Sequence, residues 1–168
     1  MPTFEEASLY TSKAGSEILG QMFTFNDKKG RKLTLRPEGT ATIQMLANQL
    51  PKNTKLFYIA DCYRYERPQK GRYRQFTQIG VEIINPTQDY KENLIDLGKI
   101  IVDEFITEYK INDSTKRGLA YYSQGIGFEF TTDSLGSQKQ ILGGGAYKEG
   151  IGFAIGLDRL LLAKENIN

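Results

Sequence analysis

The sequence contains no histidine and no tryptophan, and it has a single cysteine, Cys62. Without histidine there can be no Ser-His-Asp triad, no Cys-His dyad and no imidazole-ligated zinc site. General acid–base work would fall to carboxylates, lysine, tyrosine or the substrate, so reactions that rely on positioning and charge stabilisation are favoured, such as phosphoryl or adenylyl transfer. One cysteine allows no internal disulfide and no cysteine-based metal cluster, which favours a reducing, cytoplasmic environment.

Long hydrophobic runs are also missing. No window approaches 18 consecutive apolar residues, so we expect no membrane-spanning helix. Residues 1–6 are acidic and lack an apolar core, so we expect no signal peptide. With 168 residues, of which 39% are hydrophobic and 25% charged, the chain fits one globular domain. The net charge of +2 is too small to indicate a nucleic-acid binder by itself.

Strand-like and helix-like segments are interleaved along the chain. Helical spacing predicts helices over residues 4–10, 40–49, 87–109 (with Thr87 as N-cap) and 152–164 (with Phe153, Leu157, Leu160 and Leu161 inward). Strand patterns cover residues 21–25, 32–36, 55–65, 75–84, 118–131 and 139–147. Two pairs of these strands read as hairpins, one turning at Gly30 and one carrying a long polar loop. This order predicts an α+β fold, with an antiparallel β-sheet flanked by helices.

The polar loop of the second hairpin is strongly basic. Residues 64–74 hold five cations and one carboxylate, Glu66. On an extended strand Arg64 and Glu66 point to the same face, so Arg64 could hold a phosphate and Glu66 an amino group of one nucleotide. Arg72 could then reach a polyphosphate tail. The alternative interpretation is a solvated basic hairpin, because cations at this density repel one another unless an anion is present.

Two further segments carry polar side chains in suggestive places. Glu38 and Thr40 stand just before an expected helix, where they could cap its free N–H groups or seat a substrate ammonium group. Gln78, Gly80 and Glu82 share one face of an expected strand, which indicates a polar cavity or, alternatively, a solvent-exposed sheet face. Gly80 would leave room for a ligand to approach the backbone.

The last segment combines glycines with an Asp-Arg pair. Glycines at 143–145, 150, 152 and 156 lead into Asp158-Arg159. A helix interior loses roughly 1 kcal/mol for each glycine, so this pattern indicates a packing or ligand reason. The segment matches neither the phosphate-binding P-loop nor a dinucleotide fingerprint.

Taken together and in this order, the segments resemble the catalytic core of class II aminoacyl-tRNA synthetases, and most closely the histidyl-tRNA synthetase family. Residues 64–76 resemble the family's motif 2 nearly residue for residue. Residues 35–41 and 117–122 resemble its two histidine-binding signatures, and residues 152–159 resemble motif 3. The resemblance covers nearly the whole chain and implies the class II catalytic-domain fold.

The resemblance also implies a role for each matching residue. Arg64 and Arg117 would act at the reacting carboxylate and α-phosphate. The remaining ATP-binding residues would be Glu66 at the adenine amino group, Arg72 at the terminal phosphates, and Phe76 with Arg159 around the adenine. The histidine-binding residues would be Glu38, Thr40, Gln78, Glu82, Tyr121 and Tyr122. ATP and Mg²⁺ would be the cofactors, with Mg²⁺ bridging the phosphates and no metal ligand expected from the protein.

The implied reaction is activation of histidine to histidyl-adenylate, followed by transfer to tRNA(His). The implied partners are histidine, ATP, the tRNA(His) acceptor stem and a second subunit. The alternative is a non-catalytic histidine-binding paralogue, like the regulatory subunit of ATP phosphoribosyltransferase. Such a paralogue would be expected to lose the ATP-site cations and the arginine at 117, and both are kept here.

The sequence also departs from the family pattern. Residues 2–5 resemble only the tail of motif 1, and the span from Glu82 to Arg117 is too short for the usual insertion domain. We therefore expect a single catalytic domain over residues 1–168, without a motif 1 helix, an insertion domain or an anticodon-binding domain. Three positions differ as well: Ala120 replaces an acidic residue, Ala146 an arginine and Thr77 a histidine.

Overall fold

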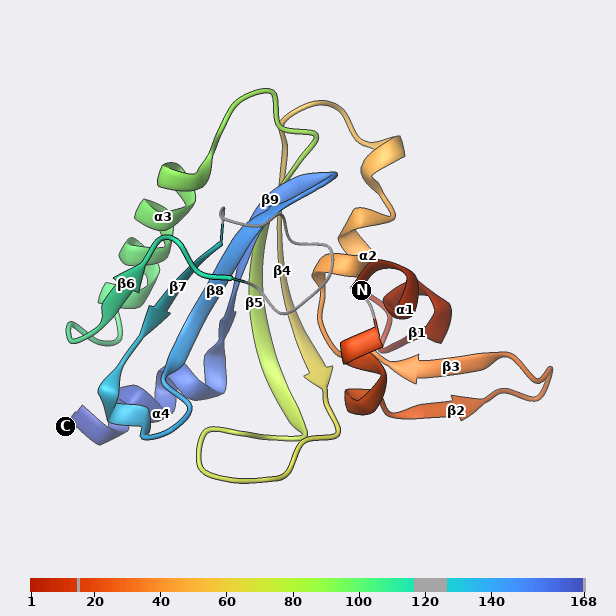
Figure 1. Ribbon diagram of the computed structural model, residues 1–168, viewed down its shortest axis with the longest axis horizontal. Helices are drawn as coiled ribbons and strands as arrows, with labels where there is room; N and C mark the ends of the chain where they lie inside the picture. The colour runs from red at the N-terminus through yellow and green to blue at the C-terminus, as the bar shows by residue number, and fades with distance from the viewer. Residues whose placement is uncertain (15, 117–126, 168) are drawn as a thin grey trace.

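The computed structural model describes residues 1–14, 16–116 and 127–167 (Figure 1). Its strands are β1 (Phe4–Glu6), β2 (Thr24–Asn26), β3 (Lys32–Leu35), β4 (Thr54–Tyr63), β5 (Gln75–Ile84), β6 (Lys110–Asn112), β7 (Phe128–Thr131), β8 (Gln140–Tyr147) and β9 (Gly150–Gly156). The α-helices are α1 (Ala7–Ala14), α2 (Thr40–Gln44), α3 (Lys91–Asp103) and α4 (Leu157–Ile167). Short 3-10 helices are η1 (Ser16–Gln21), η2 (Ala47–Gln49) and η3 (Asp133–Leu135).

The described strands form two antiparallel sheets. The larger sheet has the order β4-β5-β9-β8-β7-β6, and the smaller one has the order β1-β3-β2. In the larger sheet, Tyr58 pairs with Gly80 across β4 and β5, and Glu82 pairs with Gly152 across β5 and β9. These observations confirm the expected α+β class and the long hairpin over β4 and β5.

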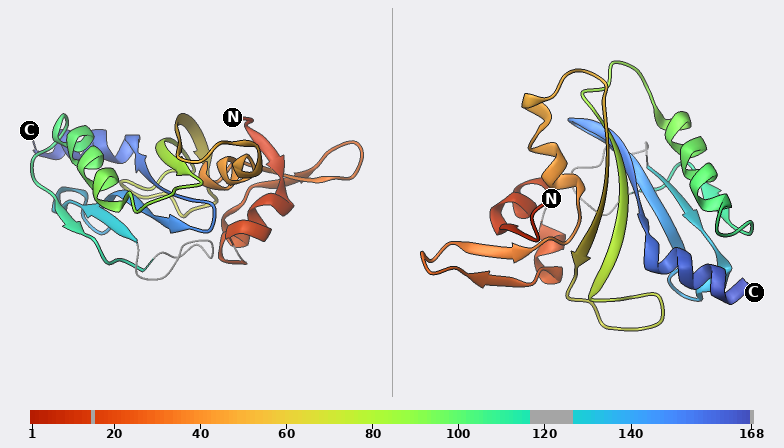
Figure 2. Two further views of the ribbon diagram at one scale, coloured as in Figure 1. Left: turned by 90° about the horizontal axis from the view of Figure 1, so that it is seen from above. Right: turned by 180° about the vertical axis from the view of Figure 1, so that it is seen from behind.

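Helices α3 and α4 pack on one face of the larger sheet (Figure 2). The main core lies between them and the sheet. Its fully buried side chains include Leu94 and Val102 of α3, Leu160 of α4, and Phe128, Phe130, Phe153 and Ile155 of the strands. The opposite face is free of these helices and carries the polar side chains described below. Among the residues that the structure describes, no helix is long and apolar enough to cross a membrane.

A second unit lies beside β4. It contains the smaller sheet together with α1 and α2, and the β2–β3 hairpin projects from it (Figure 1). The buried side chain of Arg36 joins this unit to the larger sheet. Its guanidinium donates to the Asp61 carbonyl at 3.1 and 2.6 Å and to the Pro2 carbonyl. The Arg36 carbonyl accepts from the Tyr63 amide at 2.8 Å, so one residue fixes the two sheets relative to each other.

The prediction of a helix over residues 152–164 is partly wrong. Residues 150–156 form strand β9, and the helix begins only at Leu157. In β9 the buried side chains of Ile151, Phe153 and Ile155 face the core, and the small residues between them face the other side. That alternation has the two-residue period of a strand, and β9 pairs with β5 and β8 on its two sides. Leu161 was expected inward, but it is 44% exposed on α4.

Three other boundaries differ from expectation. Helix α3 is shorter than 87–109 and has Tyr90 as its N-cap, because Thr87 instead bonds to the Asn53 side chain. The expected helix over 40–49 divides into α2 and η2. The expected helix over 4–10 begins as strand β1, because Phe4–Glu6 pairs with β3. Residues 118–126 of an expected strand lie outside the described residues, while Phe128–Thr131 is a strand.

Candidate functional site

One cavity opens on the face of the larger sheet that α3 and α4 leave free. Its volume, counting the open mouth, is about 800 Å³. The cavity is bounded by the loop over 64–74, by β5, β8 and β9, and by the start of α2. Eight of the residues expected from the sequence line it: Glu38, Thr40, Arg64, Glu66, Arg72, Phe76, Gln78 and Arg159. The fold therefore brings together side chains from four separate segments.

Arg64 and Phe76 meet at the base of the loop. The Arg64 amide donates to the Arg74 carbonyl at 2.9 Å, which extends the β4–β5 pairing into the loop. The Arg64 Nε donates to the Pro37 carbonyl at 2.9 Å, and its guanidinium carbon lies 5.3 Å from the centre of the Phe76 ring. A cation above an aromatic face is a mutually stabilising arrangement. Both side chains line the cavity, so a planar ring system entering it would meet an aromatic ring and a cation.

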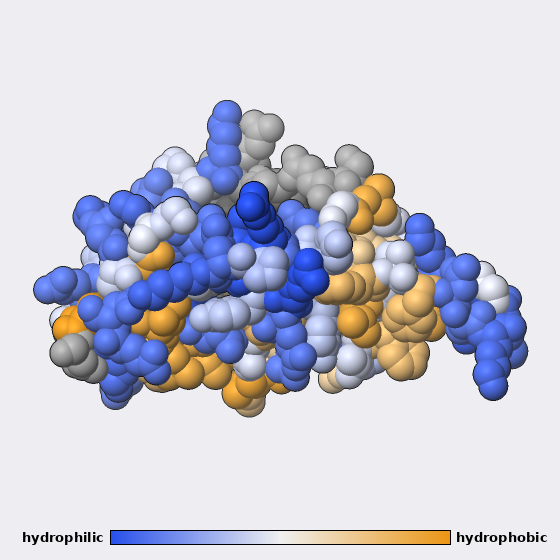
Figure 3. Space-filling view, turned by 90° about the horizontal axis from the view of Figure 1, so that it is seen from below, coloured by the Kyte–Doolittle hydropathy of each residue, from blue (hydrophilic) through white to orange (hydrophobic). Residues whose placement is uncertain are grey.

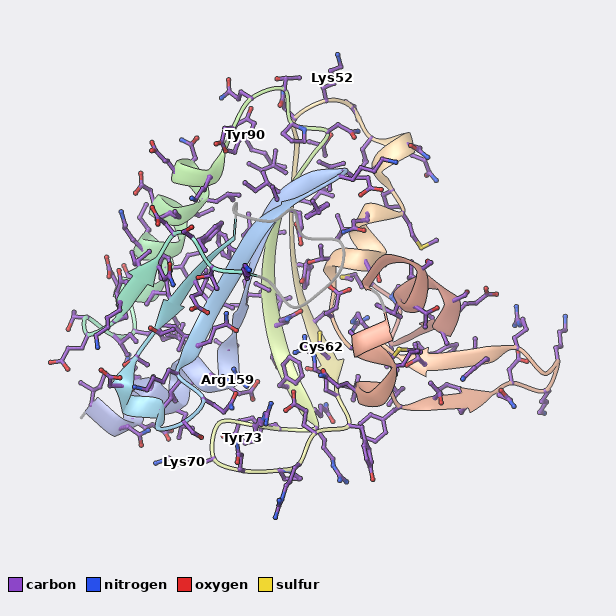
Figure 4. All side chains as sticks on the ribbon, viewed as in Figure 1. Lys52, Cys62, Lys70, Tyr73, Tyr90 and Arg159 are labelled. Carbon is purple, nitrogen blue, oxygen red and sulfur yellow. The ribbon has the colours of Figure 1, made fainter. Side chains whose placement is uncertain are left out.

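Arg159 holds the loop from the other side. Its Nε donates to the Gly71 carbonyl at 2.6 Å, and its Nη1 donates to the Gln140 carbonyl at 3.2 Å. Burial lowers the pKa of the Arg159 guanidinium, the nearby Arg64 and Arg72 lower it further, and Glu66 opposes the shift. Figure 4 shows Arg159 beside the loop that carries Lys70 and Tyr73. Because three arginines approach one another here, an anion bound among them would relieve their repulsion.

Glu66 and Arg72 form an ion pair across the loop, which the β-bridge between Gln69 and Arg72 closes. The sequence resemblance implies that these two side chains would contact opposite ends of one ATP molecule. In this structure they contact each other, with side-chain exposures of 13% and 38%. Figure 3 views the molecule from the side of this loop, where strongly hydrophilic side chains gather at the centre.

Glu38 caps helix α2. Its carboxylate accepts from the Thr40 amide at 2.6 Å and from the Ala41 amide at 3.0 Å. The capping interpretation is thus what the structure shows, and Glu38 also lines the cavity. Its carboxylate lies beside the site, and the helix N–H groups that donate to it favour negative charge there.

Glu82 lies behind the cavity wall, and it is not one of the residues that line the cavity. Its carboxyl is 1% exposed and accepts from the Thr40 hydroxyl at 2.6 Å and the Tyr147 hydroxyl at 2.8 Å. Burial raises the pKa of Glu82 to about 8, helped by the charge of Glu38 and opposed by the two hydroxyl donors. Gly152 makes this possible, because a Cβ there would lie 1.9 Å from Glu82 Oε2.

Gly80 does not leave room for a ligand, which corrects the sequence expectation. The Tyr58 ring fills that space, and a Cβ on Gly80 would lie 2.1 Å from ring atoms of Tyr58. A Cβ on Gly39 would lie 2.3 Å from the same ring, so two glycines accommodate one tyrosine. The Tyr58 hydroxyl donates to the Gln78 side-chain oxygen at 3.2 Å. Because Gln78, Gly80 and Glu82 are all buried, the alternative of a solvent-exposed sheet face is wrong.

Several site residues were missed by sequence reasoning. Tyr58 and Tyr147 orient Gln78 and Glu82, and Cys62 donates weakly to the same Gln78 oxygen at 3.4 Å. Burial raises the pKa of the Cys62 thiol to about 11, so it is an unreactive packing group. Only the strand register places these side chains beside Gln78 and Glu82.

Three expected site residues lie outside the described residues: Arg117, Tyr121 and Tyr122. The departure at Ala120 lies there as well. Ala146 lies in β8 opposite Ile151 of β9. Within the described residues, no group of three or more His, Cys, Asp or Glu side chains is placed to hold a metal ion.

The chain matches the family model described as "tRNA synthetase class II core domain (G, H, P, S and T)" over residues 23–166. It is 30% identical to the histidine–tRNA ligase of Methanospirillum hungatei, over 96% of this chain and 66% of that protein. It is 56% identical to the histidine–tRNA ligase of Methanoculleus marisnigri, over 49% of this chain and 21% of that protein.

Solved structures show the same fold. The apo histidyl-tRNA synthetase of S. aureus superposes with a TM-score of 0.76 and 26% identity, over 99% of this chain and 59% of that one. A Bacillus halodurans protein titled an ATP phosphoribosyltransferase regulatory subunit/histidyl-tRNA synthetase has a TM-score of 0.76 at 17% identity, over 97% of this chain and 73% of that one. The second likeness concerns the fold alone.

The chain spans less than two thirds of the length of the two curated relatives named above. The family model nevertheless covers most of the chain, including the cavity-lining residues from Glu38 to Arg159. The antiparallel sheet with its flanking helices is the catalytic-domain fold of these enzymes. The chain therefore belongs to the family of class II tRNA synthetase core domains.

Proposed function

We propose that this chain activates histidine with ATP, forming histidyl-adenylate and pyrophosphate, as the core of a histidine–tRNA ligase. The observation that carries the proposal is the cavity on the free face of the sheet, which is lined by three arginines and Phe76 and also by Glu38, Thr40 and Gln78. The histidine–tRNA ligases to which the chain is similar support the choice of amino acid. Cationic and carboxylate side chains in one cavity match the two charged groups of an amino acid bound next to a nucleotide.

In the proposed reaction, a carboxylate oxygen of histidine attacks the α-phosphorus of ATP. The bond from that phosphorus to the oxygen bridging the α- and β-phosphates breaks, and pyrophosphate leaves. The attacking group is already an anion, so the step needs no general base, which agrees with a chain that lacks histidine. Arg64 would stabilise the charge on the α-phosphate, while Phe76 and Arg159 would hold the adenine between them.

Mg²⁺ would arrive with the ATP phosphates and neutralise part of their charge. The cavity carboxylates suit this role for the ion, because Glu38 already accepts two amide hydrogens and Glu66 is paired with Arg72. Neither is free to build a dedicated metal cage. When ATP enters, Arg72 would leave Glu66 for the terminal phosphates, and Glu66 would become available to the adenine amino group.

Histidine-dependent exchange of pyrophosphate into ATP tests this function. We expect exchange with the unaltered chain and a loss of at least about a hundredfold with Arg64→Gln, since one oxyanion-stabilising donor is worth 10²–10³-fold. Lys52→Gln removes an exposed lysine on the loop before β4, so it serves as the charge control and should exchange normally. No exchange by folded protein, with Mg²⁺ present, would show that the chain does not form the adenylate.

Transfer of histidine to the tRNA(His) acceptor stem belongs to the same proposal. It is measured separately, as charging of tRNA(His) by protein that passes the exchange assay. The runner-up function is histidine binding without catalysis, as in a regulatory paralogue, and the Bacillus halodurans neighbour supports it at the level of fold. Calorimetry separates the two, because a regulatory protein would bind histidine and give no heat with ATP.

A further inference from the structure

Positive charge is concentrated in two short segments of this chain. Residues 24–32 and 64–74 together hold nine of the 22 Lys and Arg residues, but only two of the 20 Asp and Glu residues. The rest of the chain is therefore net negative, although the whole chain carries a net charge of +2. A separation of charge this strong creates a local positive field, which attracts polyanions.

Residues 24–32 form the β2–β3 hairpin tip, which projects from the body of the molecule (Figure 1). Asp27 shapes this tip, because its Oδ1 accepts from the Lys29 amide at 2.8 Å and from the Arg31 amide at 2.9 Å. Hydrogen bonds from Arg31 lower the pKa of the Asp27 carboxyl. Gly30 completes the turn with a φ of 76°. The tip is therefore held in one conformation by its own bonds, and its cations are positioned before any ligand arrives.

Three lysines of the hairpin form no ion pair within the described part of the chain. Lys28, Lys29 and Lys32 are all exposed, and none of them takes part in the ion pairs found there. Only Arg31 is paired, with Asp27 at 2.7 Å. Ammonium groups this close along a short hairpin repel one another, so a ligand with several negative charges would relieve the repulsion.

The base of the hairpin is joined to the basic loop over 64–74. The Tyr65 amide donates to the Gln21 carbonyl at 2.8 Å, and the Phe23 and Tyr65 rings meet edge to face with their centres 5.4 Å apart. From the loop, the Arg74 guanidinium lies 4.7 Å from the centre of the same Tyr65 ring. Figure 3 shows hydrophilic side chains both at the centre, over this loop, and at the end where the hairpin projects.

We propose that the β2–β3 hairpin binds the phosphate backbone of an RNA whose end reaches the cavity. The choice of RNA rests on the proposed function, in which an acceptor stem brings its end to the histidyl-adenylate. Three cations of the loop lie outside the cavity lining, and the hairpin lysines extend this positive surface away from the cavity: Arg67, Lys70 and Arg74. Lysine contacts to phosphate position an RNA without reading its sequence, so the hairpin is a positioning surface.

The salt dependence of RNA binding tests the proposal. The probe is a labelled stem-loop RNA with the acceptor-stem sequence of tRNA(His) and a single-stranded 3′ end, followed by fluorescence anisotropy. The double variant Lys28→Gln with Lys29→Gln should lower the slope of log affinity against log salt by about two, one for each lost phosphate contact. A stem of scrambled sequence should respond in the same way, because backbone contacts carry no sequence information.

The matched control is the double variant Lys52→Gln with Lys55→Gln. It also removes two exposed lysines, and Figure 4 shows Lys52 at the end of the molecule opposite Lys70. The control should keep the slope of the unaltered chain, and thermal unfolding verifies that both variants remain folded. An unaltered chain that does not bind the RNA at low salt, or an equal loss of slope in the two double variants, overturns the proposal. Because the assay contains neither ATP nor histidine, these results are independent of adenylate formation, which pyrophosphate exchange measures separately.

Tethered cleavage locates the hairpin on the RNA. Lys28→Cys places a thiol at the tip, and Cys62 does not compete for the label because it is fully buried and its pKa is raised to about 11. Iron-EDTA attached at residue 28 should cleave one stretch of the RNA backbone within the stem. The same label attached through Lys52→Cys should leave the RNA intact. Cleavage from residue 28 that is absent, or spread evenly along the RNA, overturns the proposed contact.

Discussion

The hydroxyl of Tyr147 lies 2.8 Å from Oε2 of the buried Glu82 carboxyl. The two residues stand 65 positions apart on β8 and β5, with β9 between these strands. They meet because β9 carries glycine at 152, where any side chain would collide with Glu82. Gly152 of β9 therefore allows the contact between Glu82 and Tyr147 behind the cavity wall.

The Glu82 carboxyl should make stability depend on pH. Its pKa is raised to about 8 from the ordinary glutamate value of 4.5, so between these values the folded chain keeps a proton that the unfolded chain has released. The free energy of unfolding should therefore fall as pH rises from about 4.5 to about 8, by on the order of a few kcal/mol, and level off above. Urea unfolding across this range measures the effect, and Glu82→Gln should flatten the slope. An unchanged slope in that variant would place the titration elsewhere.

Removing the Tyr147 hydroxyl should leave a buried carboxyl oxygen short of a donor. We expect Tyr147→Phe to cost about 1–3 kcal/mol in the free energy of unfolding and to raise the pKa of Glu82 further. Tyr65→Phe removes the same group from a ring that is 58% exposed, so its effect should stay within about 0.5 kcal/mol. Equal losses in the two variants, in chemical denaturation, would contradict the role given to Tyr147.

A methyl group at residue 80 should collide with Tyr58. Gly80→Ala places a Cβ 2.1 Å from ring atoms of Tyr58, so the ring must move and its hydrogen bond to Gln78 be lost. We expect a cost of about 1–3 kcal/mol in thermal or urea unfolding. Gly20→Ala is the matched control, because a Cβ at residue 20 would have nothing within 4 Å. A Gly80→Ala protein as stable as that control would refute the close contact.

Arg72 should distinguish ATP from AMP. If it contacts the terminal phosphates, Arg72→Gln should weaken ATP binding about ten- to a hundredfold and leave AMP binding nearly unchanged. Lys70→Gln on the same loop is the charge control, since Lys70 bonds to Asn166 and does not line the cavity. Calorimetry with both nucleotides gives the four dissociation constants. An equal loss for ATP and AMP would indicate that Arg72 acts by holding the loop.

The local patterns of the sequence predicted the elements that have strong periodicity. The β4–β5 hairpin and its basic loop followed from alternation and turn residues, and α4 followed from helical spacing except for its start. Residues 152–156 were predicted to be helical but belong to strand β9, because the glycines there carry no side chain that would mark the two-residue period of a strand. Helix α3 was expected to be longer than it is, because the apolar spacing continues past Asp103, where the helix ends.

The sequence by itself restricted the chemistry expected of the site. The absence of histidine excluded imidazole catalysis, Arg64, Glu66 and Arg72 indicated a nucleotide, and the family resemblance added Phe76 and Arg159. The assigned roles of these residues, and those of Arg117, Tyr121 and Tyr122, stay predictions.

Tertiary structure alone decided which groups are paired and which are buried. The Glu66–Arg72 ion pair, the Tyr58 ring between two glycines and the shifted pKa of Glu82 all depend on strand register and loop closure. Local propensity carries no information about such contacts, because they join residues far apart along the chain. The exposure of Phe57 and Ile59 on β4 likewise depends on where α3 and α4 pack, because these helices cover the other strands of the sheet.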